Sequence, residues 1–227
     1  MGRKADGRFD LVIFDLDGVL VDSEPIGSRV TAAALREAGI EISEAAVCDR
    51  FLGVSTASML RAIEAEHGRR LPDSFQETLR SQILTAFERE LAPVPGVPDL
   101  LDALATKRCV ASSSHPDRIR RSLEITGLLE RFAPHLFSAT MVREGKPAPD
   151  LFLLAAARMA AEPTRCLVVE DSEVGVRAGK AAGMTVFGFT GASHLRPKAH
   201  APRLQAAGAD AIFAEMPALV ALIGRSG

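Results

Sequence analysis

Apolar and polar residues follow two different patterns along the chain. Residues 9–14 are apolar except for Asp10, which is the pattern of a strand covered on both faces in a parallel sheet. Helical patterns in the second half of the chain, for example at residues 117–126, 149–159 and 173–182, alternate with short apolar runs. This alternation predicts a mostly parallel sheet flanked by helices. The further strands are expected at residues 109–112, 136–140, 166–170, 185–189 and 211–213.

The segment that follows the first strand has helical patterns only. In its last stretch an apolar residue recurs at every fourth position from Phe75 to Phe87, which gives that helix one apolar face. Asp73, followed three residues later by Gln76, predicts a capping box at the start of the same helix. Glycines and Pro72 separate the four helices that we expect here, at residues 25–38, 43–51, 55–66 and 74–91.

These patterns predict an α/β protein with two parts. The core is a Rossmann-like parallel sheet flanked by helices, and an all-helical cap domain is inserted after its first strand. The proline-rich residues 93–98 mark the return from the insertion to the core. We therefore expect residues 1–21 and 92–227 to form the core and residues 22–91 to form the cap.

Composition and charge argue against some classes of function. The chain has 227 residues, of which 47% are hydrophobic and 25% charged, and a formal net charge of −2. This charge does not favour binding to a nucleic-acid backbone, and no apolar run approaches the length of about 20 residues that crosses a bilayer. The N-terminal residues lack the apolar stretch of a signal peptide. We expect a cytoplasmic protein without a membrane or nucleic-acid partner; its oligomeric state is not predicted.

Polar residues that could bind a ligand or take part in catalysis follow the predicted strands. Asp15 and Asp17 come after the first strand and three serines, 112–114, after the second, while Lys146 comes after the third and the pair Glu170 and Asp171 ends the fourth. Ligands of open α/β sheets bind outside the carboxyl ends of the strands. We therefore expect these side chains to meet at one edge of the sheet.

This mixture of groups suits phosphoryl transfer. Carboxylate oxygens bind Mg²⁺, which shares its coordination sphere readily with a phosphate, while Lys146 and the serine turn suit the other phosphoryl oxygens. An aspartate can attack phosphorus and form an aspartyl-phosphate. A second acid two residues later can give a proton to the leaving oxygen and later take one from water.

Four segments resemble the motifs of the haloacid dehalogenase-like hydrolase superfamily. They are Phe14-Asp-Leu-Asp-Gly-Val-Leu-Val-Asp-Ser23, Val110-Ala-Ser-Ser-Ser114, Gly145-Lys-Pro-Ala-Pro-Asp150 and Val168-Val-Glu-Asp-Ser-Glu-Val-Gly-Val176. All four occur in order, and the resemblance covers residues 9–214. It is closest to the β-phosphoglucomutase-like branch, whose members carry a helical cap after the first motif.

The resemblance implies roles for individual residues. Asp15 matches the nucleophile, and Asp17 matches the general acid/base, whose main-chain carbonyl also binds the metal. Ser112 and Lys146 match the groups that hold the phosphate. The implied cofactor is Mg²⁺, with Asp15 and Asp171 as ligands and Glu170 as a partner in the metal shell. Further candidates for contact with the phosphate or with an anionic group of the substrate are Gly18, Ser113, Ser114 and Arg50.

Other residues separate the reactions known in this superfamily. Asp17 disfavours dehalogenation, because the dehalogenases lack an acid there. Residues 23–90 contain no lysine, which disfavours phosphonate hydrolysis through a Schiff base. The mutases usually carry a histidine shortly after the first motif and an arginine after Gly-Val-Ser in the cap. Here residues 23–27 lack a histidine, and Thr56 follows Ser55. These departures favour transfer of the phosphoryl group to water.

We therefore predict a Mg²⁺-dependent phosphatase that acts on a small phosphorylated metabolite, a sugar or sugar-acid phosphate. A phosphosugar mutase remains an alternative. A more remote one is a non-catalytic phospho-acceptor domain, because signalling receivers also place acids, a hydroxyl and a lysine at strand ends. Asp22 is interpreted as a helix cap and His115 as a surface or capping residue. His194 and His200 are interpreted as structural or exposed.

Overall fold

A six-stranded parallel sheet forms the centre of the molecule. The computed structural model describes residues 8–195 and 197–225, so the predictions made for residues 1–7 lie outside it. The strand order is β3-β2-β1-β4-β5-β6, and every neighbouring pair is parallel. The strands are β1 (Leu11–Phe14), β2 (Lys107–Ser112), β3 (Leu136–Ser138), β4 (Cys166–Glu170), β5 (Thr185–Phe189) and β6 (Ala211–Phe213).

The predicted strands are confirmed, with small shifts at some ends. The bounds of β4, β5 and β6 agree with the sequence pattern. Strand β3 ends two residues earlier than expected, because residues Ala139–Met141 form a 3-10 turn in which Ser138 Oγ accepts a hydrogen bond from Thr140 N. The order of the strands is that of the Rossmann fold, and the direction of the connections changes between β1 and β4.

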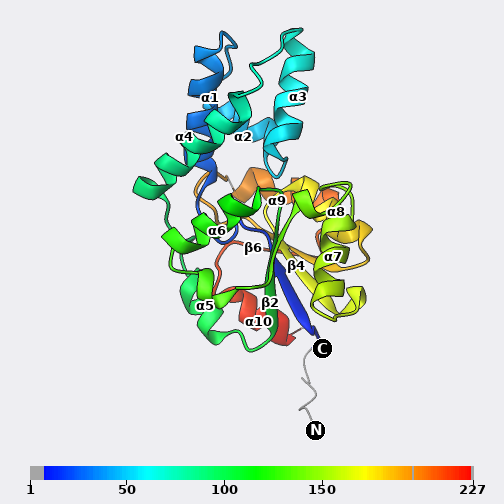
Figure 1. Ribbon diagram of the computed structural model, residues 1–227. Helices are drawn as coiled ribbons and strands as arrows, with labels where there is room; N and C mark the ends of the chain where they lie inside the picture. Colours follow the sequence, from blue (N-terminus) through cyan, green and yellow to red (C-terminus); the bar gives the residue numbers. More distant parts are fainter. Residues whose placement is uncertain (1–7, 196, 226–227) are drawn as a thin grey trace.

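Helices cover both faces of the sheet (Figure 1). Leu11 and Ile13 of β1 pack with α7 (Asp150–Arg158) and α8 (Glu173–Ala181). Val12 and Phe14 belong to the other apolar cluster, as the two-residue period of a strand requires. That cluster includes residues of α5 (Val97–Ala103), α6 (Pro116–Ile125) and α10 (Ala218–Arg225). The sequence analysis gave no residue ranges for helices α5, α10 and α9 (Pro197–Ala207).

The four helices predicted after the first strand are present. They are α1 (Glu24–Glu37), α2 (Glu44–Phe51), α3 (Thr56–His67) and α4 (Phe75–Glu90), and we call them the helical segment. Leu79, Ile83 and Phe87 form the expected buried face of α4. The capping box predicted at Asp73 is wrong: Ser74 occupies the N-cap position without a side-chain hydrogen bond. The carbonyl of Pro72 accepts the hydrogen bond from Phe75 N instead.

The two connections between the helical segment and the sheet run side by side. Asp22 N donates to Ala92 O at 3.0 Å, and Val94 N donates to Leu20 O at 3.0 Å. Figure 1 shows the helical segment gathered beyond one end of the sheet, next to the loop that follows β1. The paired connections lie at the predicted boundaries 21/22 and 91/92, and the division into two domains stays a prediction. Among the described helices, none combines the length and the apolar character that crossing a membrane requires.

Candidate active site

The carboxyl ends of β1 and β4 lie next to each other in the middle of the sheet. Asp15 follows β1 directly, and its main-chain N donates to Val169 O of β4 at 3.0 Å. Glu170 is the last residue of β4, and Asp171 follows it. The reversal of strand connections between β1 and β4 leaves a crevice where ligands of such sheets bind. The register of the two strands therefore brings the acids of two distant segments together.

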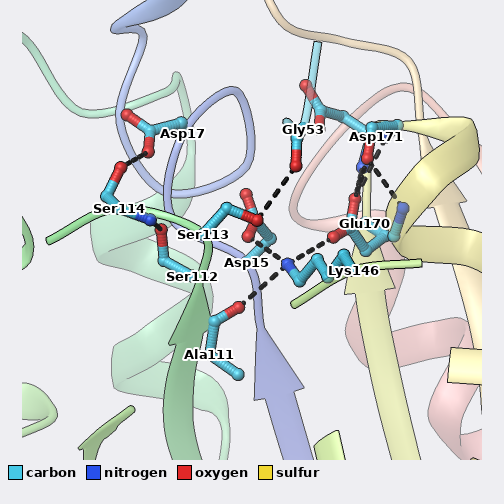
Figure 2. A network of polar contacts seen from close by, with 12 residues as sticks. Asp15, Asp17, Gly53, Ala111, Ser112, Ser113, Ser114, Lys146, Glu170 and Asp171 are labelled. Carbon is cyan, nitrogen blue, oxygen red and sulfur yellow. Dashed lines mark hydrogen bonds and ion pairs between the residues drawn. The ribbon is translucent and has the colours of Figure 1, made fainter. Parts of the chain in front are cut away.

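Lys146 joins two of these acids. Its Nζ lies 2.5 Å from Asp15 Oδ1, 2.6 Å from Glu170 Oε1 and 3.0 Å from the carbonyl oxygen of Ala111 (Figure 2). The Lys146 side chain is only 1% exposed. Burial alone lowers the pKa of this ammonium, but the two neighbouring carboxylates outweigh burial and raise the pKa above its ordinary value. Lys146 is therefore a fixed positive charge at the end of the sheet.

The turn after β4 holds Glu170 rigidly. Glu170 Oε2 accepts hydrogen bonds from Asp171 N at 3.1 Å, Ser172 N at 3.1 Å and Ser172 Oγ at 2.9 Å. Gly175 lies so close that a Cβ at this position would be 1.8 Å from Glu170 Oε1. A glycine is therefore required in the first turn of α8 for Glu170 to occupy this place.

Asp15, Glu170 and Asp171 form a cluster that fits a metal ion. One carboxylate oxygen of each lies within 4.8 Å of the others, and all three residues are buried. Three carboxylates beside one ammonium leave two negative charges in excess. Burial, followed by repulsion from neighbouring carboxylates, raises the pKa of Asp171 well above its usual range. Burial also raises the pKa of Asp15, although Lys146 opposes the shift.

Asp17 has a separate environment, although it lies only two residues from Asp15. Its Oδ1 accepts hydrogen bonds from Ser23 Oγ at 2.6 Å and Arg118 Nη2 at 2.7 Å, and its Oδ2 accepts one from Ser114 Oγ at 2.7 Å. Figure 2 shows the Asp17 carboxylate turned toward Ser114, away from Lys146. Burial raises the pKa of Asp17, but Arg118 and the two hydroxyls outweigh it and leave the pKa below its ordinary value.

The three serines at the end of β2, residues 112–114, have three different partners. Ser112 Oγ accepts a hydrogen bond from Ser114 N at 3.1 Å, and Ser114 in turn donates to Asp17. Ser113 Oγ donates to the carbonyl oxygen of Gly53 at 2.9 Å. Gly53 lies between α2 and α3, so this bond connects the core with the helical segment. The serine turn thus links the end of the sheet to the helices above it.

Two adjoining cavities lie between the core and the helical segment. The smaller one, of about 70 Å³, is lined by Asp15, Asp17 and Ser112 from the core and by Glu24 and Thr56 from the helical segment. The larger one, of about 790 Å³, lies between α3, α4, the start of α6 and the loop at Lys146. Ser113, Ser114 and Arg118 line both cavities. The reactive groups thus face a space that both parts of the molecule enclose.

Comparison with known proteins decides the family. The model of the family described as haloacid dehalogenase-like hydrolase matches residues 9–183. The chain belongs to this family. It is 34% identical over 194 residues to the 6-phosphogluconate phosphatase of Escherichia coli K12, covering 85% of this chain and 88% of the relative. It is 31% identical over 183 residues to the fructose-1-phosphate phosphatase of the same organism, covering 78% and 94% of the two chains.

A solved structure agrees with this assignment. The crystal structure of a haloacid dehalogenase-like protein of unknown function from Agrobacterium tumefaciens C58 superimposes with a TM-score of 0.81. The two chains are 42% identical, and the match covers 95% of this hydrolase and 98% of the other chain. The predicted family and the α/β fold class are confirmed, and so is the predicted enzyme class, a phosphoric monoester hydrolase.

Gly18 and Arg50 differ from the other predicted site residues. Gly18 has a φ of +76°, and a Cβ at this position would lie 2.0 Å from Asp171 Oδ2. The glycine therefore makes room for Asp171, while its contact with a phosphate stays a prediction. The structure does not bring Arg50 to the carboxylate cluster. Its guanidinium, in the last turn of α2, pairs with Glu66 of α3 and lines a different groove.

The sequence analysis did not identify two residues of the site, Arg118 and Glu24. Arg118 of α6 is the ion-pair partner of Asp17. Glu24, at the start of α1, lines the smaller cavity. Burial, with repulsion from Asp17 next in importance, raises the pKa of Glu24 to about 7. Glu24 directly follows the first motif, which was a usable signal. Arg118 lies within an ordinary arginine-rich helix, so the sequence around it gave no signal of a role in the site.

The predictions for Asp22 and the histidines have mixed outcomes. His115 is the N-cap of α6, as expected, with Nδ1 3.4 Å from Asp117 N. Asp22 does not cap α1, because Ser23 occupies that position, and Asp22 Oδ1 accepts a hydrogen bond from Ser193 N at 3.3 Å instead. His194 and His200 both reach Asp171. His194 Nε2 is 3.4 Å from Asp171 Oδ2, and His200 Nε2 is 2.5 Å from the Asp171 carbonyl oxygen.

Proposed function

We propose that this hydrolase is a Mg²⁺-dependent phosphatase that acts on a sugar or sugar-acid phosphate through an aspartyl-phosphate on Asp15. One observation carries the proposal. Three buried carboxylates converge around one lysine, with Lys146 Nζ 2.5 Å from Asp15 Oδ1, and they leave two negative charges in excess. A divalent cation balances this charge, and a phosphate ester supplies the remaining oxygen ligands.

The donor set fits Mg²⁺, which prefers oxygen ligands. Asp15, Glu170 and Asp171 would hold the ion, together with the main-chain carbonyl of Asp17 that the family resemblance implies. Asp171 Oδ2 is buried and has no hydrogen-bond partner, as expected for a carboxylate that needs an additional positive partner. When bound, Mg²⁺ offsets negative charge on the phosphoryl oxygens and so reduces their repulsion of the attacking carboxylate.

In the first step Asp15 acts as the nucleophile. Lys146 holds Asp15 Oδ1, so Oδ2 is the oxygen that forms the new bond to phosphorus. The bond between phosphorus and the substrate oxygen breaks, and the leaving oxygen takes a proton from Asp17. Lys146 and Ser112 stabilise the negative charge on the phosphoryl group during this transfer. The products of the step are the free alcohol and an aspartyl-phosphate.

In the second step water attacks phosphorus and Asp17 takes the water proton. The bond between phosphorus and Asp15 breaks, which restores the Asp15 carboxylate and releases phosphate. The contacts of Asp17 with Arg118, Ser23 and Ser114 favour its ionised form, which is the form that accepts this proton. The first step requires Asp17 to carry a proton and to turn toward the leaving oxygen.

The larger cavity supports a substrate with a second anionic group. Its charged lining comprises five cationic residues, Arg61, Arg80, Arg118, Arg143 and Lys146, and two anionic ones, Glu77 and Glu144. The phosphate occupies the end near Lys146. Arg80, Arg118 and Arg143 pair with Glu77, Asp17 and Glu144, so Arg61 is the cation that faces the rest of the substrate. A sugar acid carries a carboxylate there. The similarity to a 6-phosphogluconate phosphatase points in the same direction.

A panel of phosphate esters tests the proposal. Phosphate release is measured with Mg²⁺ for 6-phosphogluconate, glucose 6-phosphate, fructose 1-phosphate and related esters, and kcat/KM is determined for each. We expect release of phosphate, with the highest kcat/KM for a sugar-acid phosphate. Isomerised product without free phosphate, stimulated by a sugar bisphosphate, would identify a mutase. A stable phosphoprotein without turnover would identify a phospho-acceptor.

Arg61→Met sharpens the choice of substrate. Arg61 lines the larger cavity, and its hydrogen bond to Ser58 Oγ at 2.9 Å leaves other guanidinium donors for a ligand. We expect a KM about tenfold higher for 6-phosphogluconate, because one charge-assisted hydrogen bond is lost. The KM for glucose 6-phosphate should change little. The control, Arg36→Met, changes an exposed residue outside both cavities. Equal losses for the acid and the neutral sugar would contradict the carboxylate assignment.

A further inference from the structure

Unpaired polar atoms concentrate beside Asp171. Among the described residues, five buried side-chain polar atoms have no hydrogen-bond partner, and three of them are Asp171 Oδ2 and both ring nitrogens of His194. The two side chains are 1% and 3% exposed, and His194 Nε2 lies 3.4 Å from Asp171 Oδ2. Native proteins leave few such atoms unpaired, and each calls for an explanation. Three such atoms at one place point to an interaction between the His194 and Asp171 side chains.

The chain brings His194 to this place by specific contacts. His194 lies in the loop after β5, where Ser193 N donates to Asp22 Oδ1 at 3.3 Å and Leu195 N donates to Ala192 O at 3.1 Å. On the opposite side, a Cβ at Gly18 would lie 3.0 Å from His194 Cε1. The absence of a side chain at Gly18 therefore leaves room for the imidazole beside Asp171. Loops that follow three strands, β1, β4 and β5, meet here.

Asp171 differs from the other carboxylates of the site in how its side chain is held. Lys146 donates to Asp15 and to Glu170, and Glu170 accepts three further hydrogen bonds from the turn after β4. For the Asp171 carboxylate, His194 is the partner within reach. His200 bonds the main-chain carbonyl of Asp171 and thus fixes its backbone. His194 is therefore the residue in a position to fix the orientation of the Asp171 side chain.

We propose that His194 is a positioning residue for the metal site. Its Nε2 hydrogen donates to Asp171 Oδ2 and fixes the orientation of that carboxylate relative to Asp15 and Glu170. A small rotation of either side chain shortens the 3.4 Å separation to a hydrogen bond of about 3 Å. Partners of this kind orient metal ligands, and their loss typically lowers metal affinity by about 10- to 100-fold.

The test measures metal binding, because the inference rests on the proposed Mg²⁺ site. Mn²⁺ is titrated into the full-length, substrate-free protein and the free ion is followed by electron paramagnetic resonance, with Mg²⁺ affinity obtained by competition. His194→Leu retains apolar bulk without a donor. His194→Gln returns an amide N–H near the position of Nε2. His135→Leu, at an exposed histidine outside the site, is the matched control. Thermal unfolding in EDTA checks that each variant folds.

We expect His194→Leu to bind Mn²⁺ and Mg²⁺ about 10- to 100-fold more weakly than the wild-type protein, and His194→Gln to remain within about threefold. Wild-type affinity in His194→Leu would overturn the inference, and so would equal losses in the Leu and Gln variants, because the ring would then act only by packing. If His194→Leu does not fold, wild-type affinity in His194→Gln supports the donor role and a loss there overturns it. Failure of the wild-type protein itself to bind either ion would instead refute the proposed Mg²⁺ dependence.

Discussion

Asp15 and Asp17 lie two residues apart in one loop, and their surroundings have opposite electrostatic balances. Asp15 belongs to a group of three carboxylates that share one ammonium, Lys146. Asp17 accepts hydrogen bonds from one arginine and two hydroxyl groups. Asp15 is buried and Asp17 is mostly buried, and burial alone raises the pKa of each. The donors and cations around them decide that the pKa of Asp15 rises and that of Asp17 falls.

This difference shows which part of the site the protein completes by itself. The surroundings of Asp17 are balanced, because Arg118 compensates its charge. The surroundings of Asp15 carry excess negative charge and need a cation from solution. Removing a metal should therefore disturb the cluster of Asp15, Glu170 and Asp171 and leave Asp17 largely unaffected. Four experiments test this contrast.

Asp15→Asn should have the largest effect. The variant lacks the attacking carboxylate, so phosphate release should fall by about 10⁴-fold or more. Its thermal unfolding temperature in EDTA should not fall, because the raised pKa of Asp15 means that its ionised form is unfavourable in the fold. A phosphate-release assay and thermal unfolding measure the two effects. Turnover within tenfold of the wild-type rate would exclude Asp15 as the nucleophile.

Asp17→Asn should reduce phosphate release by about 10²- to 10⁴-fold, because the proton donor and acceptor is lost. Its stability should also fall, by about 1–3 kcal/mol, because Arg118 loses its charged partner in a mostly buried place. Urea unfolding of both aspartate variants in EDTA gives the comparison. The contrast between the two acids would fail if Asp15→Asn were destabilised as much as Asp17→Asn.

Asp171→Asn should abolish stabilisation by Mg²⁺. A ligand at 100 times its dissociation constant stabilises a folded protein by about 3 kcal/mol, which corresponds to a rise in unfolding temperature of about 5 °C or more for a chain of this size. The wild-type protein and Asp17→Asn should show this rise on addition of Mg²⁺, and Asp171→Asn should not. An equal rise in all three would place the ion elsewhere.

Glu24→Gln should have the smallest effect, and the effect should depend on pH. The pKa of Glu24 in the fold is about 7, against an ordinary value of 4.5. Because the folded-state pKa is raised, the contribution of Glu24 to stability is full below pH 4.5 and is lost as pH rises through 7. This rise in pKa corresponds to about 3 kcal/mol, which partial exposure of Glu24 to solvent reduces. Glu24→Gln should therefore stabilise the protein by about 2 kcal/mol at pH 8 and have little effect near pH 4.5.

Urea unfolding in EDTA across this pH range provides the measurement for Glu24→Gln. Glu24 lines the smaller cavity together with Asp17, so the result also tests whether the Glu24 carboxyl repels Asp17. A difference between variant and wild type that does not change with pH would show that the Glu24 carboxyl is solvated and does not repel Asp17.

Much of the site could be predicted because parallel strands place their carboxyl ends along one edge. Asp15, Ser112, Lys146, Glu170 and Asp171 lie at or after the carboxyl ends of β1, β2, β3 and β4, so identifying the strands was enough to expect them together. Arg50 shows the limit of this reasoning. It lies near the Gly53 loop in sequence, but the orientation of α2 directs it to Glu66 and away from the cavities. A local pattern does not determine how a helix is rotated against the sheet.

The amino-acid sequence by itself determined the parallel sheet, the helical insertion and the acids, serine and lysine at the strand ends, because hydrophobic periodicity and strand direction are local properties. The tertiary structure alone decided which groups balance those acids. Arg118 reaches Asp17 from α6, and His194 reaches Asp171 from the loop after β5. Neither partner is near its acid in sequence, and only the packing of helices and loops over the end of the sheet brings each partner within range of its acid.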